Sequence, residues 1–231
     1  MAARAGQQPL STESTPEGAE PSRGMQLAWA SVFAVVFAWS AIGPKDYPTW
    51  FLEVLPAAIG AVILWFTRDR YPLTSLLYFL ILVHSIVLIV GGHYTYAEVP
   101  LFDWIRDTFG HTRNNYDKVG HFLQGFVPAI IAREITIRNA VFSTAAWRNT
   151  FIVGMCMGIS AFYELIEWAA ALLSEEASES FLGTQGYAWD TQSDMAWAML
   201  GAILALLLLG RLHDRQLRAR HWRRNPRAGA V

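Results

Sequence analysis

The chain alternates long apolar runs with short polar connections. Six of these runs are apolar enough to cross about 30 Å of hydrocarbon when helix tilt and interfacial residues are allowed for. They extend over residues 27–42, 50–66, 73–90, 119–132, 151–173 and 189–209. The pattern therefore predicts an all-α fold, a polytopic membrane helix bundle with about six transmembrane helices.

The fourth run is the shortest of the six. It contains His121, Gln124 and Pro128 within residues 119–132. A polar run of this length is compatible either with a transmembrane helix or with a broken or re-entrant segment. The number of spans depends mainly on this run.

The composition agrees with a membrane protein. The chain is 53% hydrophobic and 16% charged, whereas a soluble domain carries about 25% charged residues. Its ten tryptophans and eight tyrosines suit the level of the lipid headgroups, where a ring is apolar on one side and wet on the other. We expect one membrane domain over 25–210, between a disordered cytoplasmic tail over 1–24 and a basic cytoplasmic tail over 211–231.

Basic residues predict the orientation, because lysines and arginines of short connections stay on the cytoplasmic side. Under the six-span model one side holds fourteen of the eighteen, namely Arg4, Arg23, Arg68, Arg70, Arg133, Arg138, Arg148 and the seven arginines of 211–227. The opposite side holds Lys45, Arg106, Arg113 and Lys118. Both termini are therefore expected in the cytoplasm.

The arginine-rich segment over 211–227 is typical either of nucleic-acid binding or of attachment to anionic lipid. Each arginine near the inner leaflet contributes about 1 kcal/mol of surface attraction, which accounts for such a segment directly after a membrane span. We therefore expect membrane lipids as partners and no nucleic acid. The sequence does not indicate an oligomeric state.

Polar side chains collect at the outer end of the fourth run. Asp117, His121 and Gln124 are spaced four and three residues apart, which places them on one helical face. Lys118 directly follows the first of them. This end of the run therefore offers acid, base and amide groups together.

Two glutamates lie inside the fifth run. Glu164 and Glu167 are three residues apart on one face, about 14 and 9 Å below the outer end of the run at Leu173. A carboxylate at such a depth costs about 2.5 kcal/mol or more, so each should face the protein interior or a wet cavity and have a partner.

Other polar groups reach the same level from neighbouring connections. Asp190 and Asp194 share a helical face at the start of the sixth run, and His93 and Tyr94 close the third. The main candidate cluster is Asp117, Lys118, His121, Glu164, Glu167, Asp190 and Asp194. Secondary candidates are His93, Tyr94, Gln124, Gln185 and Gln192.

Acids and histidines in a partly dry pocket can do three kinds of work. They can bind a divalent metal ion, for which His121, Glu164, Glu167 and Asp194 are the candidate ligands. They can act as acid and base, or hold a polar ligand or a proton in a transport path. The alternative is that Lys118 and His121 only neutralise the acids and lock the helices together.

A metal or ligand site open to the periplasmic side or the outer leaflet agrees best with the common depth of these groups. Lys118 would then meet an anionic group such as a lipid phosphate. A proton-coupled transporter is less favoured, because the inner halves of the runs are almost purely apolar and no inverted repeat is evident. A structural membrane protein is the third alternative.

Enzyme activity is left undecided by the sequence. No Gly-x-Ser-x-Gly or His-Glu-x-x-His motif, and no cysteine outside the runs, supports a lipid-modifying mechanism. The single Cys156 and His84 lie within apolar runs, where we expect a packed thiol and a hydrogen-bonded core imidazole.

Four segments resemble a known family. HYTYAEVP (93–100), RNNYDKVGHFLQGFVPA (113–129), YELIEW (163–168) and GTQGYAWDTQSDM (183–195) are similar to the YjdF family of bacterial inner-membrane proteins, whose function is unassigned. The resemblance covers about residues 25–210 and implies a six-helix protein of the bacterial cytoplasmic membrane. It also leads us to expect an aspartate after GTQG, where this chain has Tyr187.

A more distant similarity is to VanZ-like proteins. These also pair an Asp-Lys-x-x-His helix start, here Asp117 to His121, with a later glutamate and aspartate on successive helices. The likeness is linked to glycopeptide-antibiotic resistance, but similarity at the level of fold says little about function.

Overall fold

The computed structural model describes residues 22–173 and 185–219, and its regular structure within these ranges is entirely helical. The helices are α1 (Arg23–Ser40), α2 (Tyr47–Thr67), α3 (Ser75–His93), α4 (Pro100–Phe109), α5 (Tyr116–Arg138), α6 (Ala145–Leu173) and α8 (Asp190–Ala219). The predicted all-α fold is confirmed. Most of both predicted tails, and the acidic part of the fifth connection, lie outside the described residues.

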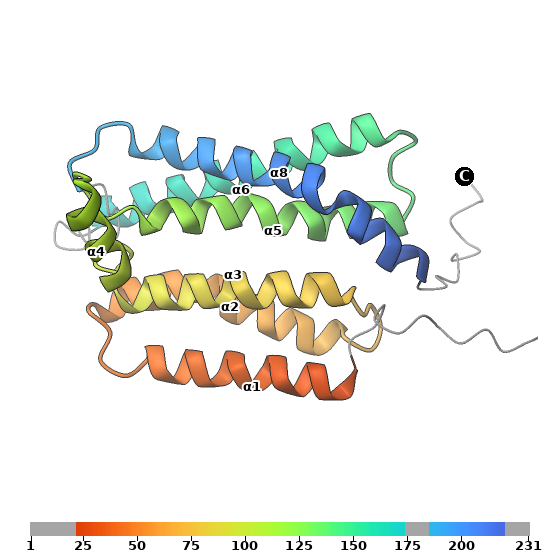
Figure 1. Ribbon diagram of the computed structural model, residues 1–231, viewed down its shortest axis with the longest axis horizontal. Helices are drawn as coiled ribbons and strands as arrows, with labels where there is room; N and C mark the ends of the chain where they lie inside the picture. The colour runs from red at the N-terminus through yellow and green to blue at the C-terminus, as the bar shows by residue number, and fades with distance from the viewer. Residues whose placement is uncertain (1–21, 174–184, 220–231) are drawn as a thin grey trace, which may run out of the picture.

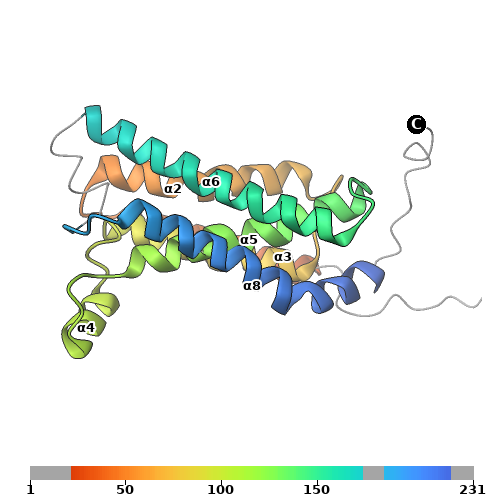
Figure 2. The same ribbon diagram turned by 90° about the horizontal axis from the view of Figure 1, so that it is seen from above.

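The long helices run along one axis. Six helices of 18 to 30 residues lie side by side, and the short α4 lies across one end of them (Figures 1 and 2). We call this end the α4 end. Helix α1 begins, and α8 ends, at the opposite end of the bundle (Figure 1).

Four helices, α2, α3, α6 and α8, are long and apolar enough to cross a membrane, judged on the described residues. Large apolar side chains cover the outside of the bundle. Phe66 is 74% exposed and Leu207 is 72% exposed. An apolar surface of this extent suits lipid better than water, so four of the six predicted runs have the length and the surface of membrane helices.

The fourth run corresponds to α5, which lies inside the bundle. This helix packs against α3, α6 and α8 and buries Lys118, His121 and Glu134 along its length. Polar side chains that face other helices make a segment less apolar without exposing charge to lipid. Helix α5 is continuous through Pro128 and extends beyond both ends of the predicted run, which is why that run appeared short.

Glycines let α5 and α8 touch backbone to backbone. A Cβ on Gly125 would lie 1.8 Å from the carbonyl oxygen of Ala198, and a Cβ on Gly201 would lie 2.0 Å from that of Phe122. No real Cβ approaches a carbonyl oxygen so closely, so only glycine fits at either position. This contact brings the first turns of α8 beside the first turns of α5, as interfaces of small residues do in membranes.

We expect Gly201→Ala to lower the folded yield and the thermal midpoint, because the added methyl group must push α5 away from α8. Overpacking of this kind costs about 1–3 kcal/mol. Gly154→Ala is the matched control, since a Cβ there meets no atom within 4 Å. Size-exclusion profiles and thermal unfolding in one detergent test the prediction, and equal behaviour of the two variants would contradict it.

Candidate functional site

The main candidate residues meet near the α4 end of the bundle. They come from the first turns of α5, the last third of α6 and the first turns of α8. All are buried except Asp117, which is largely buried. The predicted shared depth therefore corresponds to one contiguous region, which contains an ion-pair cluster, a histidine group and a cavity.

Lys118 is the centre of the ion-pair cluster. Its Nζ donates to Asp190 Oδ1 and to Asp194 Oδ1, each at 2.7 Å, and lies 3.4 Å from Asp117 Oδ2. Arg113 adds a second cation, which pairs with Asp117 and with Asp190. Two cations from the start of α5 thus hold the two aspartates that begin α8.

Arg113 was not among the predicted site residues, although it lies in one of the quoted motifs. It precedes α5, four residues before Asp117, and its side chain is only 7% exposed. The signal that could have found it is its position close before Asp117 in a quoted motif, since Arg113 lies outside α5 and the spacing rule for helical faces does not apply to it. Its only role in the predictions was as one of the four basic residues expected on the outer side.

Gln185 joins the connection before α8 to the residues that precede α5. Its amide makes two hydrogen bonds to the backbone of Asn114, one accepted from the N–H and one donated to the carbonyl, both at 2.9 Å. Its own φ is 48°, in the left-handed region that β-carbons disfavour. Gln185 therefore positions the connection before α8 against the start of α5, without touching the carboxylates.

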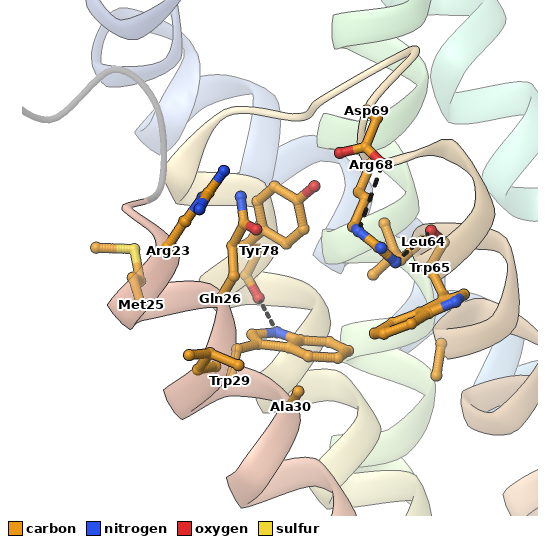
Figure 3. Close-up of a pocket in the computed structure, with 12 residues that line it drawn as sticks. Arg23, Met25, Gln26, Trp29, Ala30, Leu64, Trp65, Arg68, Asp69 and Tyr78 are labelled. Atoms are coloured by element: carbon orange, nitrogen blue, oxygen red, sulfur yellow. Dashed lines mark hydrogen bonds and ion pairs between the residues drawn. The ribbon is translucent and has the colours of Figure 1, made fainter.

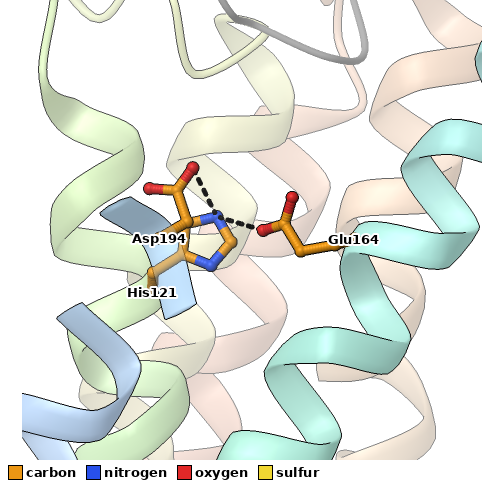
Figure 4. Close-up of side chains that lie close together, drawn as sticks. All are labelled: His121, Glu164 and Asp194. Atoms are coloured by element: carbon orange, nitrogen blue, oxygen red, sulfur yellow. Dashed lines mark ion pairs between the residues drawn. The ribbon is translucent and has the colours of Figure 1, made fainter. Parts of the chain in front are cut away.

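A second group lies one turn further along α5 (Figure 4). The Nε2 atom of His121 faces Glu164 Oε1 of α6 at 3.9 Å and Asp194 Oδ2 of α8 at 3.8 Å. Its Nδ1 atom lies 3.1 Å from Gln124 Oε1. Since that amide oxygen only accepts hydrogen bonds, we assign the ring proton to Nδ1. A neutral His121 then turns the lone pair of Nε2 toward both carboxylates.

One carboxylate oxygen of Glu164 lacks a hydrogen-bond partner. Among the described residues, Glu164 Oε1 is buried and accepts no hydrogen bond. Buried polar atoms are almost always hydrogen-bonded, so such an oxygen calls for a partner. His121 Nε2, at 3.9 Å, is too far away to be that partner by a direct hydrogen bond.

A cavity of about 310 Å³ opens beside the histidine between α2, α3, α5 and α6. Glu167 lines it, as expected of a glutamate in the fifth run, and so does Glu53 of α2. Glu53 is 5% exposed and accepts a hydrogen bond from the Tyr163 hydroxyl at 2.8 Å. His84 also lines the cavity, and its Nε2 has no hydrogen-bond partner among the described residues.

Tyr96 closes the cavity toward the α4 end. Both Thr95 and Tyr96 have left-handed φ values, 53° and 55°, each of which costs about 1–3 kcal/mol in a non-glycine residue. The ring fits between Gly91 of α3 and Gly120 of α5, where a Cβ would come within 2.3 and 2.9 Å of it. Burial, and next the charge of Glu53, raises the pKa of the Tyr96 hydroxyl well above its usual value.

The region carries an excess of acid. Its carboxyl groups belong to Glu53, Asp117, Glu164, Glu167, Asp190 and Asp194. Only Arg113 and Lys118 among the described residues supply permanent positive charge to them. Six acids against two cations cannot all be ionised in a site of low dielectric, so protons or a bound cation must balance the rest.

Several predicted residues lie apart from this region. His93 is hydrogen-bonded to the Ser40 carbonyl at 2.9 Å and packs on Trp39, and Tyr94 packs on His93, so both join α3 to α1. Gln192 is exposed.

Tyr187, at the position where the resemblance suggested an acid, lies beside the ion-pair cluster. The centre of its ring is 5.7 Å from the Arg113 guanidinium carbon and 5.7 Å from Lys118 Nζ.

A second polar network lies at the opposite end of α5. Glu134, fully buried, binds Thr74 Oγ1 at 2.8 Å, His213 Nε2 at 3.0 Å and Arg138 Nη1 at 3.0 Å. Arg133 reaches His213 from the other side at 2.8 Å. This network was not predicted, because the predicted fourth and sixth runs end before it, whereas α5 and α8 continue as helices to Arg138 and Ala219.

We expect Lys118→Met to destabilise the protein by about 3–5 kcal/mol, because Asp190 and Asp194 would lose the cation that they share. Lys45→Met is the matched control, since the Lys45–Glu98 ion pair is more than half exposed at the same end. That control should leave the unfolding midpoint almost unchanged. Thermal unfolding of both variants in one detergent makes the comparison, and equal midpoints would contradict a stabilising role for Lys118.

Comparison with known proteins places this architecture in a family. The family model described as "Predicted membrane protein (DUF2238)" matches residues 25–215. The inner membrane protein YjdF of Escherichia coli (strain K12) is 47% identical over 189 residues, which cover 82% of this chain and 90% of that protein. The resemblance inferred from the four motifs is thereby confirmed, while no solved structure matches the chain. The chain therefore belongs to the DUF2238 family of predicted membrane proteins.

Proposed function

We propose that this protein binds a divalent metal ion near the outer face of the membrane, with His121, Glu164 and Asp194 as its ligands. The observation that carries the proposal is the buried Glu164 Oε1, which accepts no hydrogen bond among the described residues and faces His121 Nε2. A cation between these two atoms would satisfy both. Each ligand comes from a different helix, α5, α6 or α8.

The distances suit such an ion. One nitrogen or oxygen atom of each of the three residues lies within 4.8 Å of the others. Nitrogen and oxygen ligands bind Zn²⁺ at about 2.0–2.2 Å, so two ligands of one ion lie roughly 3–3.5 Å apart. The separations of 3.8 and 3.9 Å therefore need to close by only a few tenths of an ångström.

The environment of His121 supports a ligand role. Metal-binding histidines usually donate the second ring N–H to an acceptor that fixes the tautomer, and Gln124 Oε1 provides that acceptor at 3.1 Å. The imidazole and carboxylate donors are suited to Zn²⁺ and to similar transition-metal ions. Glu167, which we also predicted as a ligand, lines the neighbouring cavity and lies outside this group of three.

The other acidic group is a weaker candidate. Asp117, Asp190 and Asp194 also lie close enough together to hold an ion. Lys118 and Arg113 already supply positive charge to these three carboxylates. For the same reason we no longer assign a lipid phosphate to Lys118, and we propose that its role is to hold Asp194 in place for the metal.

We further propose six membrane spans with both termini in the cytoplasm, α1 and α5 being the two added to the four apolar helices. Helix α5 lies among membrane helices, and its polar residues face inward. Nine of the thirteen lysines and arginines within the described residues belong to the helix ends and connections at the end where α1 begins and α8 ends, namely Arg23, Arg68, Arg70, Arg133, Arg138, Arg148, Arg211, Arg215 and Arg218. The name of the E. coli relative supports the inner membrane as the location.

Elemental analysis of the detergent-purified protein tests the metal site. The wild type should contain about one equivalent of a divalent metal per chain, and Glu164→Gln and His121→Ala should each reduce it to background. The matched controls are Glu98→Gln and His111→Ala, which change exposed residues of the same types at the same end. These controls should keep the full metal content.

Folded yield must be recorded for every variant. Metal lost from well-folded Glu164→Gln and His121→Ala proteins would support the site. A well-folded wild type that takes up no metal, together with poorly folded cluster variants, would overturn it in favour of a cluster that only locks the helices together.

Labelling with a membrane-impermeant maleimide in intact cells tests the six-span topology. On a Cys156→Ala background, Thr108→Cys should react and Ser143→Cys should not, because α5 would separate the two exposed positions. Permeabilised cells provide the control, in which both should react. Equal labelling of the two positions in intact cells would mean that α5 does not cross the membrane.

A further inference from the structure

An apolar groove lies at the end of the bundle where α1 begins, opposite the α4 end at which the acidic region lies. It has a volume of about 400 Å³ and is formed by the start of α1, the end of α2 and Tyr78 near the start of α3 (Figure 3). Trp29, Ala30, Ala61 and Leu64 line its apolar part. The two alanines leave space that larger side chains would fill.

The shape of the groove is held by a tryptophan. The Nε1 atom of Trp29 donates to the carbonyl oxygen of Tyr78 at 2.6 Å, which fixes the indole against α3. Its ring stacks on Phe33 with centroids 5.5 Å apart. A tryptophan with its N–H satisfied and its ring facing an apolar groove is typical of the interfacial region of a bilayer.

The rim of the groove is basic. Arg68 lies with its guanidinium 3.8 Å from the centre of the Trp65 ring and donates to the Trp65 carbonyl at 2.8 Å. Arg23 is exposed on the facing helix, and no ion pair joins it to another described residue. The single acid among the described residues that line the groove is Asp69, which lies 3.7 Å from Arg68 and is 86% exposed. Two arginines against one aspartate leave the rim with a net positive charge.

We propose that this groove binds one anionic phospholipid, with its phosphate between Arg23 and Arg68 and an acyl chain along Trp29, Ala30 and Ala61. Charge complementarity selects the occupant, because arginines near a membrane surface attract acidic headgroups. The apolar part suits a hydrocarbon chain and offers nothing to a polar solute. Lipid binding in this groove does not depend on the metal site. Only the location of the groove in the cytoplasmic leaflet rests on the proposed orientation.

Native mass spectrometry with lipid added back to delipidated protein tests the proposal. In an equal mixture of phosphatidylglycerol and phosphatidylcholine of the same chain length, the wild type should retain one phosphatidylglycerol. The Arg23→Gln/Arg68→Gln variant should lose this retention by about tenfold or more. Ala61→Trp should lose it too, because it fills the groove while keeping both arginines.

The matched control is Arg211→Gln/Arg215→Gln. It removes two exposed arginines from the same end of the bundle, and neither of them lines the groove. This variant should bind lipid as the wild type does. Monodisperse elution of every variant, and an unchanged metal content, keep loss of fold and failure of the metal site distinguishable from loss of the lipid.

Three results would overturn the proposal. Equal retention of the two lipids by the wild type would show that charge does not select the occupant. An equal loss in the Arg211→Gln/Arg215→Gln control would assign the effect to overall charge instead of the groove. A dimer of the wild type that Ala61→Trp abolishes would identify a second copy of the chain as the occupant.

Discussion

The need to neutralise carboxylates held out of water organises this bundle. Asp190 and Asp194 begin α8 and are both buried, and Lys118 of α5 binds the two at 2.7 Å. A buried carboxylate without a partner is so costly that the ion pairs determine how α8 starts relative to α5. The glycine contacts between the two helices allow this approach, because any larger residue would separate the cation from its acids.

Hydrophobic patterning predicted where the helices lie but gave too short a length for the central helix, α5. Outer helices such as α2 face lipid and are recognisable from their apolar residues, whereas α5 faces protein on most sides and needs no continuous apolar run. The predicted run at 119–132 was therefore shorter than α5. The same effect hid Glu134 and His213, which are fully buried but lie where the sequence resembles a basic connection and a tail.

Helical spacing predicted which side chains share a face wherever two residues belong to one helix. The Asp190–Asp194 and Glu164–Glu167 pairs both face the interior, as their spacing implied. Spacing carries no information about which helices are neighbours, so Glu53 of α2 was missed although it is the only charged residue of its run. His93 was misplaced for a related reason, since a shared depth does not imply a shared position around the bundle.

The distribution of polar contacts suggests how a bound metal would act on the fold. Helices α5 and α8 are joined at both ends, by Lys118 with its aspartates and by Glu134 with His213, and by the glycine contact between them. Helix α6 places Glu164 Oε1 3.9 Å from His121 Nε2, and its Cys156 Sγ lies 3.5 Å from the Gly125 carbonyl oxygen of α5. A metal bound by both His121 and Glu164 would shorten the separation between them and so draw this part of α6 toward α5. Because Tyr163 of α6 also binds Glu53, such a movement would change the cavity that the two residues line.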